Sequence, residues 1–255
     1  MGAALPRDAL QIMTAVQIHE LPDGRRIAFR YAPGGGPALV FLPGYMSDMA
    51  GSKATTLFEW AQTNNRACLL FDYSGCGQSG GDFATRTLSR WRDEVVALIA
   101  AQCPGQVVLV GSSMGGWLML LVALAIPAQM TALVGIAAAP DFTDWGYSSE
   151  QKAQLAAGET VLEANPYGPE PTPTYPAFWR DGEALRLLDS DIALTCPVRL
   201  LHGQADADVP WHTALRLAQA LRSADVQVTL VKDGDHRLSR TSDITLLLQT
   251  IAALG

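Results

Sequence analysis

The chain has 255 residues, 49% of them hydrophobic and 17% charged, with a formal net charge of −7. A chain of this length can bury one large core, so we expect a single domain over residues 1–255. The acidic balance, with no cluster of lysine and arginine, argues against a nucleic acid or an anionic membrane surface as partner.

Residues 1–20 show no basic segment followed by an apolar stretch, which a secretory leader would have, and the segment after Gly2 does not fit a myristoylation site. The longest apolar segments, around 117–126 and 131–139, are shorter than the ~20 residues that cross a bilayer. We therefore expect a cytoplasmic protein without stable insertion in a membrane.

Two strand patterns open the chain, at 14–20 and 25–31, and the turn residues Leu21-Pro22-Asp23-Gly24 between them predict an antiparallel hairpin. From about residue 38, strand and helix patterns alternate, which is typical of a mostly parallel sheet with helices on both faces. We predict a sheet of eight strands, the other six lying at 38–42, 67–71, 106–112, 132–138, 198–202 and 226–231.

Apolar residues three and four positions apart predict packing helices around 88–98 and 244–251. The composition changes only at about 141–195, where residues 165–176 hold five prolines between helix-like pieces at 148–157 and 177–188. We predict that 141–195 form a small cap inserted after the sixth strand. Its aromatic residues either line an acyl pocket or pack the cap on the body: Trp145, Tyr147, Tyr175, Phe178 and Trp179.

One motif indicates an enzyme. Gly111-Ser112-Ser113-Met114-Gly115 follows a buried strand pattern and precedes a helical stretch at 116–124. The pattern G-x-S-x-G in that context is typical of a nucleophile elbow, where a Cβ at position 111 or 115 would clash with the sharp turn. We predict that Ser113 is the nucleophile of a hydrolase, the alternative being an ordinary glycine-rich turn.

A serine hydroxyl needs a base that takes its proton and an acid that orients the base. Functional groups collect at the carboxyl ends of parallel strands, and His236 follows the strand at 226–231. It is the best base of the four histidines. His19 lies in the predicted opening hairpin. His202 is expected to bond a buried backbone group, and His212 is expected to begin a helix.

The acid has three candidates. Asp206 and Asp208 share the loop after the strand at 198–202, and Asp141 follows the sixth strand. We favour Asp206, which gives the chain order serine, aspartate, histidine of α/β-hydrolases. Each aspartate has the alternative role of capping a turn.

An acyl-transfer site also needs N–H donors for the tetrahedral oxyanion. The backbone amide of Met114, directly after the nucleophile, is one. The loop after the third strand should supply the other, and Tyr45 is the residue placed to offer its amide.

A glycine pattern at 75–80 matches the dinucleotide-binding motif G-x-G-x-x-G. That motif should open directly into a helix, whereas Gly81-Asp82-Phe83 continues a loop. Asp93 and Glu94, about 20 residues on, lie in a helix pattern and not at a strand end. We read the segment as a loop across the top of the sheet. The four cysteines have no C-x-x-C spacing, so neither a zinc site nor a disulfide framework is predicted.

Several stretches resemble the α/β-hydrolase superfamily, namely DYSGCGQS (72–79), GSSMGGWLML (111–120) and HGQADADVPWH (202–212). With LPGY (42–45), CPVRLL (196–201) and DHR (235–237), they are more narrowly similar to the mitochondrial α/β-hydrolase-domain acyl-protein thioesterases that also hydrolyse acyl glucuronides. The resemblance covers nearly all of 38–251. Without a transit peptide, this chain resembles a bacterial or otherwise unprocessed relative.

The resemblance implies an α/β-hydrolase fold and a triad of Ser113, Asp206 and His236. It implies an oxyanion hole from the amides of Tyr45 and Met114, with no metal and no cofactor. The implied substrates are thioesters of long acyl chains on protein cysteines and ester-linked glucuronides, so the partner is an acylated protein or a small-molecule ester.

Three residues are expected to bind substrate. Phe178 and Trp179 lie in the cap, and Arg237 follows the base, where it either meets a substrate carboxylate or forms a surface salt bridge. Two other functions stay open. One is a broad carboxylesterase for small soluble esters, and the other is a ligand-binding protein that keeps the hydrolase fold without turnover. The oligomeric state is not predicted.

Overall fold

The structure, a computed structural model, describes residues 15–166 and 168–254. The predictions about Gly2 and a leader at 1–14, and the first residue of the strand predicted at 14–20, lie outside the described residues. No helix within the two described ranges is long and apolar enough to cross a membrane.

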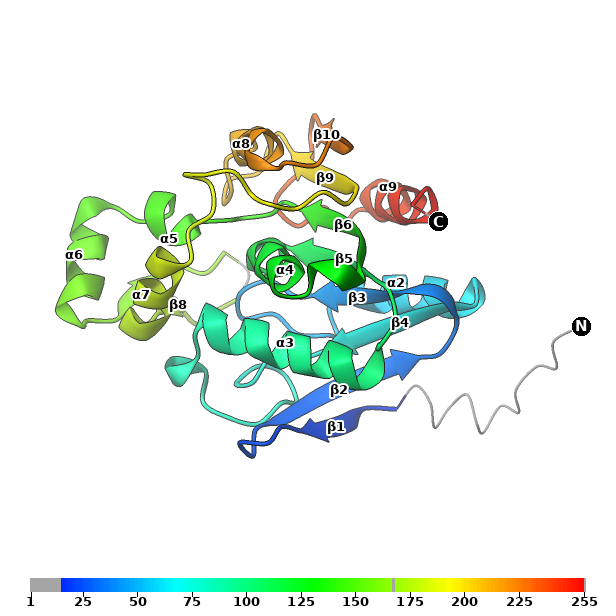
Figure 1. The fold of residues 1–255 in the computed structure, drawn as a ribbon. Coiled ribbons are helices and arrows are strands. Elements are labelled where there is room, and N and C mark those ends of the chain that lie inside the picture. The colour runs from blue at the N-terminus through cyan, green and yellow to red at the C-terminus, as the bar shows by residue number, and fades with distance from the viewer. Residues whose placement is uncertain (1–14, 167, 255) are drawn as a thin grey trace, which may run out of the picture.

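Eight strands form one sheet in the order β1-β2-β4-β3-β5-β6-β9-β10 (Figure 1). The pairs β1/β2 and β2/β4 are antiparallel, and the other neighbours run parallel. This confirms the predicted fold class and sheet. The strands are β1 (Gln17–Glu20), β2 (Arg26–Ala32), β3 (Gly35–Leu42), β4 (Arg66–Phe71), β5 (Val107–Ser112), β6 (Met130–Ile136), β9 (Val198–Gly203) and β10 (Val226–Val231).

Helices cover both faces of the sheet because successive strand residues point to opposite sides. In β5, Val107 and Leu109 join the core under one set of helices, and Val108 and Val110 join the core under the other. Figure 1 shows the first set in front of the sheet. The first set is α3 (Leu88–Gln102), α4 (Met114–Ala125) and α8 (His212–Ala220), and the second is α2 (Ser52–Thr63) and α9 (Thr241–Ala252).

β6 ends two residues before its predicted end. Ala137 has a φ of 45°, which turns the chain out of the strand, and the N–H of Ala139 then donates to the carbonyl of Ser113 at 3.1 Å. The end of β6 is therefore tied to the turn that carries the predicted nucleophile.

The predicted cap, residues 141–195, lies between β6 and β9 and gathers at the left of Figure 1, beyond one end of the strands. It contains a two-stranded antiparallel sheet that the sequence did not predict, in which Pro173 pairs with Leu162. Prolines fit such a short edge strand because it has no second neighbour that needs their N–H. The elements are α5 (Phe142–Trp145), α6 (Ser149–Ala157), β7 (Val161–Glu163), β8 (Thr172–Thr174) and α7 (Pro176–Ala184).

α7 ends at Ala184, four residues before its predicted end at 188. The N–H groups of Leu187 and Leu188 donate to the carboxylate of Asp141, at 2.7 to 3.0 Å, instead of to helical carbonyls. Asp141 therefore joins the two ends of the cap segment. Burial raises the pKa of Asp141, although these two N–H groups oppose the shift.

We expect Asp141→Gly to lower the free energy of unfolding by about 2–4 kcal/mol. The substitution leaves two N–H donors without an acceptor and increases the conformational entropy of the unfolded state. Glycine accepts the φ of 57° at this position, so backbone strain does not contribute. Denaturant unfolding measures the loss. Asp141→Asn keeps one acceptor oxygen and should lose less, and equal stability of Asp141→Gly and the wild type would contradict the joining role.

Candidate active site

Ser113 lies on a sharp turn between β5 and α4, with φ 56° and ψ −122°. A side chain at either flanking glycine would collide with backbone: a Cβ at Gly111 would lie 2.3 Å from the carbonyl oxygen of Gly115, and one at Gly115 would lie 2.1 Å from that of Leu42. The N–H of Ser113 donates to the carbonyl of Ile136 at 2.9 Å. The strained backbone of the elbow is thus held by neighbouring strands.

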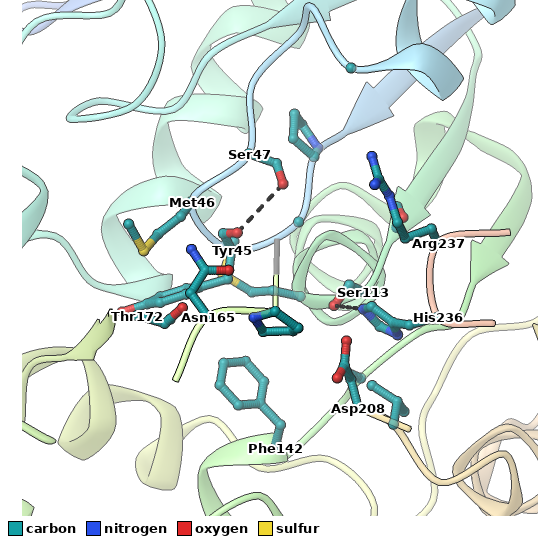
Figure 2. Close-up of a pocket in the computed structure, with 18 of the residues that line it drawn as sticks. Tyr45, Met46, Ser47, Ser113, Phe142, Asn165, Thr172, Asp208, His236 and Arg237 are labelled. Atoms are coloured by element: carbon teal, nitrogen blue, oxygen red, sulfur yellow. Dashed lines mark hydrogen bonds between the residues drawn. The ribbon is translucent and has the colours of Figure 1, made fainter. Parts of the chain in front are cut away.

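Three side chains that are distant in the sequence meet at this turn. Ser113 Oγ lies 3.1 Å from Nε2 of His236, and Nδ1 of His236 lies 2.9 Å from Oδ2 of Asp206. They follow β5, β10 and β9, whose carboxyl ends share one edge of the sheet. Figure 2 shows Ser113 and His236 side by side in the pocket. A proton on Nδ1, facing the carboxylate, leaves Nε2 free to accept from the serine hydroxyl.

The side chain of Asp206 is fully buried, with 0% exposure. Burial raises its pKa, but hydrogen bonds from His202 and His236 and the charge of His236 outweigh this effect and hold the pKa well below its ordinary value. Its Oδ1 also accepts the N–H groups of Asp208 and Val209, at 2.9 and 2.8 Å. The carboxylate is therefore ionised at neutral pH.

Of the three predicted acids, Asp206 contacts His236, whereas Asp141 is bound to the end of the cap segment. Asp208 lines the pocket, and its carboxylate lies within 4.8 Å of ligand atoms of Asp206 and His236. These three residues are the one group among the described residues that has metal-ligand spacing. Because Asp206 and His236 already bond to each other, a cation there would compete with that hydrogen bond.

The other histidines lie where the sequence placed them. His202 is fully buried, and its Nε2 lies 3.1 Å from the carbonyl oxygen of Val209. His212 begins α8 and stacks on the ring of Trp211, with 3.6 Å between ring centroids.

The loop after β3 lies against Ser113: a Cβ at Gly44 would come within 3.4 Å of Ser113 Cβ. Tyr45 and Met114 line the same pocket as Ser113. Within the described part of the chain, neither backbone N–H is bonded to another residue. The hydroxyl of Tyr45 donates to the carbonyl of Pro173 at 2.8 Å, so this loop is also tied to the cap.

A pocket of about 680 Å³ opens above Ser113 and His236, between the strand ends and the cap (Figure 2). Its volume is within the range of small-molecule sites. The cap supplies aromatic residues to the wall, and the loop after β3 and the start of α2 supply polar ones. The first group is Phe142, Trp145 and Tyr147, and the second includes Ser47, Asp48, Ser52 and Lys53.

The residues predicted to bind substrate divide into two groups. Arg237 lines the pocket beside His236. Phe178 and Trp179 are not among the lining residues. Phe178 is 1% exposed and packs on the rings of Tyr45 and Phe142, and Trp179 Nε1 donates to the carbonyl of Thr143 at 3.0 Å. The prediction that Phe178 and Trp179 bind substrate is therefore not supported by their position. Both pack the cap, which was the second role considered for its aromatic residues.

Lys53 is a pocket residue that sequence reasoning missed. Burial and the nearby positive charge of Arg237 lower its pKa to about 8. Its Nζ donates to the backbone carbonyl of Arg237. Lys53 follows a loop at the end of a strand, where pocket residues of parallel sheets concentrate. That position is the only feature of the sequence that indicates a pocket residue.

The glycine loop at 75–80 is structural. A short helix over Phe83–Thr85 follows it, and no long helix begins there. Glu94 accepts from the N–H and hydroxyl of Ser74 and pairs with Arg25 at 2.6 Å, so this acid fixes the loop to α3 and the first hairpin. The segment is therefore a loop without the directly following helix that a dinucleotide-binding motif requires, in agreement with the rejection of that motif.

Residues 39–243 match the model of the alpha/beta hydrolase family, and the chain therefore belongs to that family. Membership agrees with the strand order, the elbow and the arrangement of Ser113, Asp206 and His236. Family membership supports hydrolase activity, while the bond that is cleaved depends on the individual site.

Among its relatives, human palmitoyl-protein thioesterase ABHD10, mitochondrial, is 38% identical over 93% of this chain and 79% of its own length. The crystal structure of a putative hydrolase from Agrobacterium vitis S4 is 38% identical, with a TM-score of 0.88 over 94% of this chain and 99% of that one. Mouse alpha/beta hydrolase domain-containing protein 10 is 37% identical, with a TM-score of 0.87 over 94% and 98%.

Proposed function

We propose that the protein is a serine hydrolase that cleaves carboxylic ester or thioester bonds through an acyl-enzyme. The observation that carries the proposal is the unbroken line of contacts from Ser113 Oγ through His236 to the buried carboxylate of Asp206. This arrangement activates a hydroxyl that is otherwise a weak nucleophile at neutral pH.

In the proposed reaction, Ser113 Oγ attacks the carbonyl carbon while His236 Nε2 takes its proton. Asp206 keeps the imidazole oriented and balances its positive charge. The amides of Tyr45 and Met114 stabilise the oxyanion. His236 then protonates the leaving thiol or alcohol, and water hydrolyses the acyl-enzyme by the same route.

For the substrate, we propose acyl-chain thioesters or acyl-glucuronide-type esters, carried by a protein or a small molecule. Two observations support this class. The relatives that are 38–41% identical are named as palmitoyl-protein thioesterases, and the cap presents an aromatic wall to the pocket. The compartment proposed is the cytoplasm, although the names of those relatives include "mitochondrial".

The dependence of the rate on the length of the substrate's acyl chain distinguishes this proposal from a broad small-ester carboxylesterase. We expect kcat/KM on p-nitrophenyl esters to hold or rise from acetate to palmitate, because a longer chain covers more of the apolar wall. The same acyl groups should be compared as oxygen esters and thioesters. A steep fall beyond about four carbons would favour the small-ester enzyme, since a small pocket fills.

A fluorophosphonate probe distinguishes these two enzymes, the acyl-chain hydrolase and the small-ester carboxylesterase, from a non-catalytic binding protein. The probe forms a covalent adduct only with an activated serine. We expect one adduct, on Ser113, in the wild type and none in Ser113→Ala. An intact protein without any adduct would favour the binding protein.

A further inference from the structure

His202 contacts the acid of the proposed triad. It lies near the end of β9, and its side chain is completely buried. Its Nε2 lies 3.2 Å from Oδ2 of Asp206 and 3.1 Å from the carbonyl oxygen of Val209. Oδ2 is the same oxygen that Nδ1 of His236 approaches at 2.9 Å. Two imidazoles therefore meet at one carboxylate oxygen.

The surroundings assign the proton on His202. Both groups that face Nε2 are hydrogen-bond acceptors, so Nε2 must carry the proton. Nδ1 is buried and has no hydrogen-bond partner among the described residues. A proton on Nδ1 would be a buried donor without an acceptor, which is costly. The N–H on Nε2 is thus hydrogen-bonded to the carbonyl of Val209, with Oδ2 of Asp206 as a second acceptor 3.2 Å from Nε2.

With His202 included, four N–H groups reach the carboxylate of Asp206. Two backbone N–H groups, of Asp208 and Val209, bind Oδ1, and the two imidazoles approach Oδ2. A carboxylate held on both oxygens loses contacts if it rotates. Because Oδ2 of Asp206 already faces the N–H of His202, it is a weaker base toward the proton on Nδ1 of His236.

We propose that His202 is a positioning residue of the triad: its Nε2–H fixes Oδ2 of Asp206 in the orientation that receives His236 and keeps the proton on the imidazole. The inference rests on the proposed function, because it assigns His202 a role through Asp206. His202 is not itself among the residues that line the pocket, and Ser113 Oγ contacts His236.

The test compares His202→Leu, which removes the donor, with His202→Gln, whose amide nitrogen reaches the position of Nε2. On the p-nitrophenyl ester that the wild type cleaves fastest, we expect His202→Leu to lower kcat about 10- to 100-fold, as loss of an orienting hydrogen bond to a functional group does elsewhere. KM should change less than about twofold, because the substrate pocket is intact. His202→Gln should recover most of the loss.

A spectroscopic readout separates positioning from a merely structural role. The proton on Nδ1 of His236 is expected to give a downfield proton NMR signal, because it is bonded to a carboxylate. In His202→Leu this signal should move, and in His202→Gln it should return toward the wild-type position. His212→Leu is the matched control, since His212 lies on α8, outside the triad, and should leave both kcat and the signal unchanged.

Two results would overturn the inference: wild-type kcat with an unmoved signal in folded His202→Leu, or a loss in His202→Gln as large as in His202→Leu. If circular dichroism shows that His202→Leu is unfolded, His202→Asn replaces that variant, because the shorter asparagine amide cannot reach Oδ2 of Asp206. Equal kcat in His202→Asn and His202→Gln would then refute the positioning role of His202. An inactive Ser113→Ala beside a fully active His202→Leu removes only this inference, whereas an active Ser113→Ala removes the proposed function itself.

Discussion

Replacing Ser113 with alanine is expected to lower kcat by about 10⁶-fold, the loss that removal of a triad serine produces when no other group can form the acyl-enzyme. Substrate binding should persist, because the pocket walls come from the cap and from the loop after β3. Alanine also has a smaller side chain at a φ of 56°, so the elbow keeps its shape. Steady-state hydrolysis of a p-nitrophenyl ester, with single-turnover measurements for the residual rate, gives the ratio.

The control for this prediction is Ser190→Ala, which removes an exposed hydroxyl near the end of the cap segment, at a residue that does not line the pocket. It should retain the wild-type rate. A Ser113→Ala protein that is folded and keeps more than about a hundredth of the wild-type kcat would contradict a serine acyl-enzyme, since binding and oxyanion donors alone accelerate the reaction far less than a complete triad.

Asp206→Asn is expected to lower kcat by about 10⁴-fold while the fold persists. The amide nitrogen of the new side chain would face Nδ1 of His236, so the imidazole would carry its proton on Nε2. In that tautomer Nε2 donates to Ser113 instead of accepting from it. Asp208→Asn is the informative comparison, because Asp208 was the second candidate for the acid. A larger loss in Asp208→Asn than in Asp206→Asn would reverse the assignment.

The same variant has a pH-dependent stability signature. The pKa of Asp206 is lowered in the folded protein, so its charged form stabilises the fold at pH values above the unfolded pKa of about 3.9, and this contribution disappears as the pH falls below that value. The wild type should therefore exceed Asp206→Asn in unfolding free energy at pH 6 to 7, and the gap should narrow below about pH 4. Denaturant unfolding at several pH values measures it; a gap independent of pH would contradict the assignment of a charged, bonded Asp206.

Local patterns in the chain were sufficient to predict the parallel sheet and the sharp turn that carries Ser113. The run before Gly111 and the apolar stretch after Gly115 define a strand and a helix by themselves, and the glycines are required by contacts within that same turn and the adjacent strand. The meeting of Asp206 and His236 with Ser113 could be predicted for a related reason, because loops after parallel strands share one edge of the sheet whatever their distance in the sequence.

The cap was harder to interpret because its residues have no regular period that reports their surroundings. Phe178 and Trp145 are both aromatic residues of the same segment, yet the first is packed under Tyr45 and the second lines the pocket. Likewise, the length of α7 depends on Asp141, which lies 46 residues away from Leu187. Such contacts depend on how the segment folds back on itself.

The sequence by itself determined the class of the fold and the tight turn that carries Ser113, because strand periodicity and the steric needs of such a turn are local properties. Only the tertiary structure decided that Asp206 and not Asp208 contacts His236, that His202 approaches the same carboxylate, and which cap residues line the pocket. These choices rest on the directions of side chains over distances of a few ångströms, and such directions are set when strands and cap pack together.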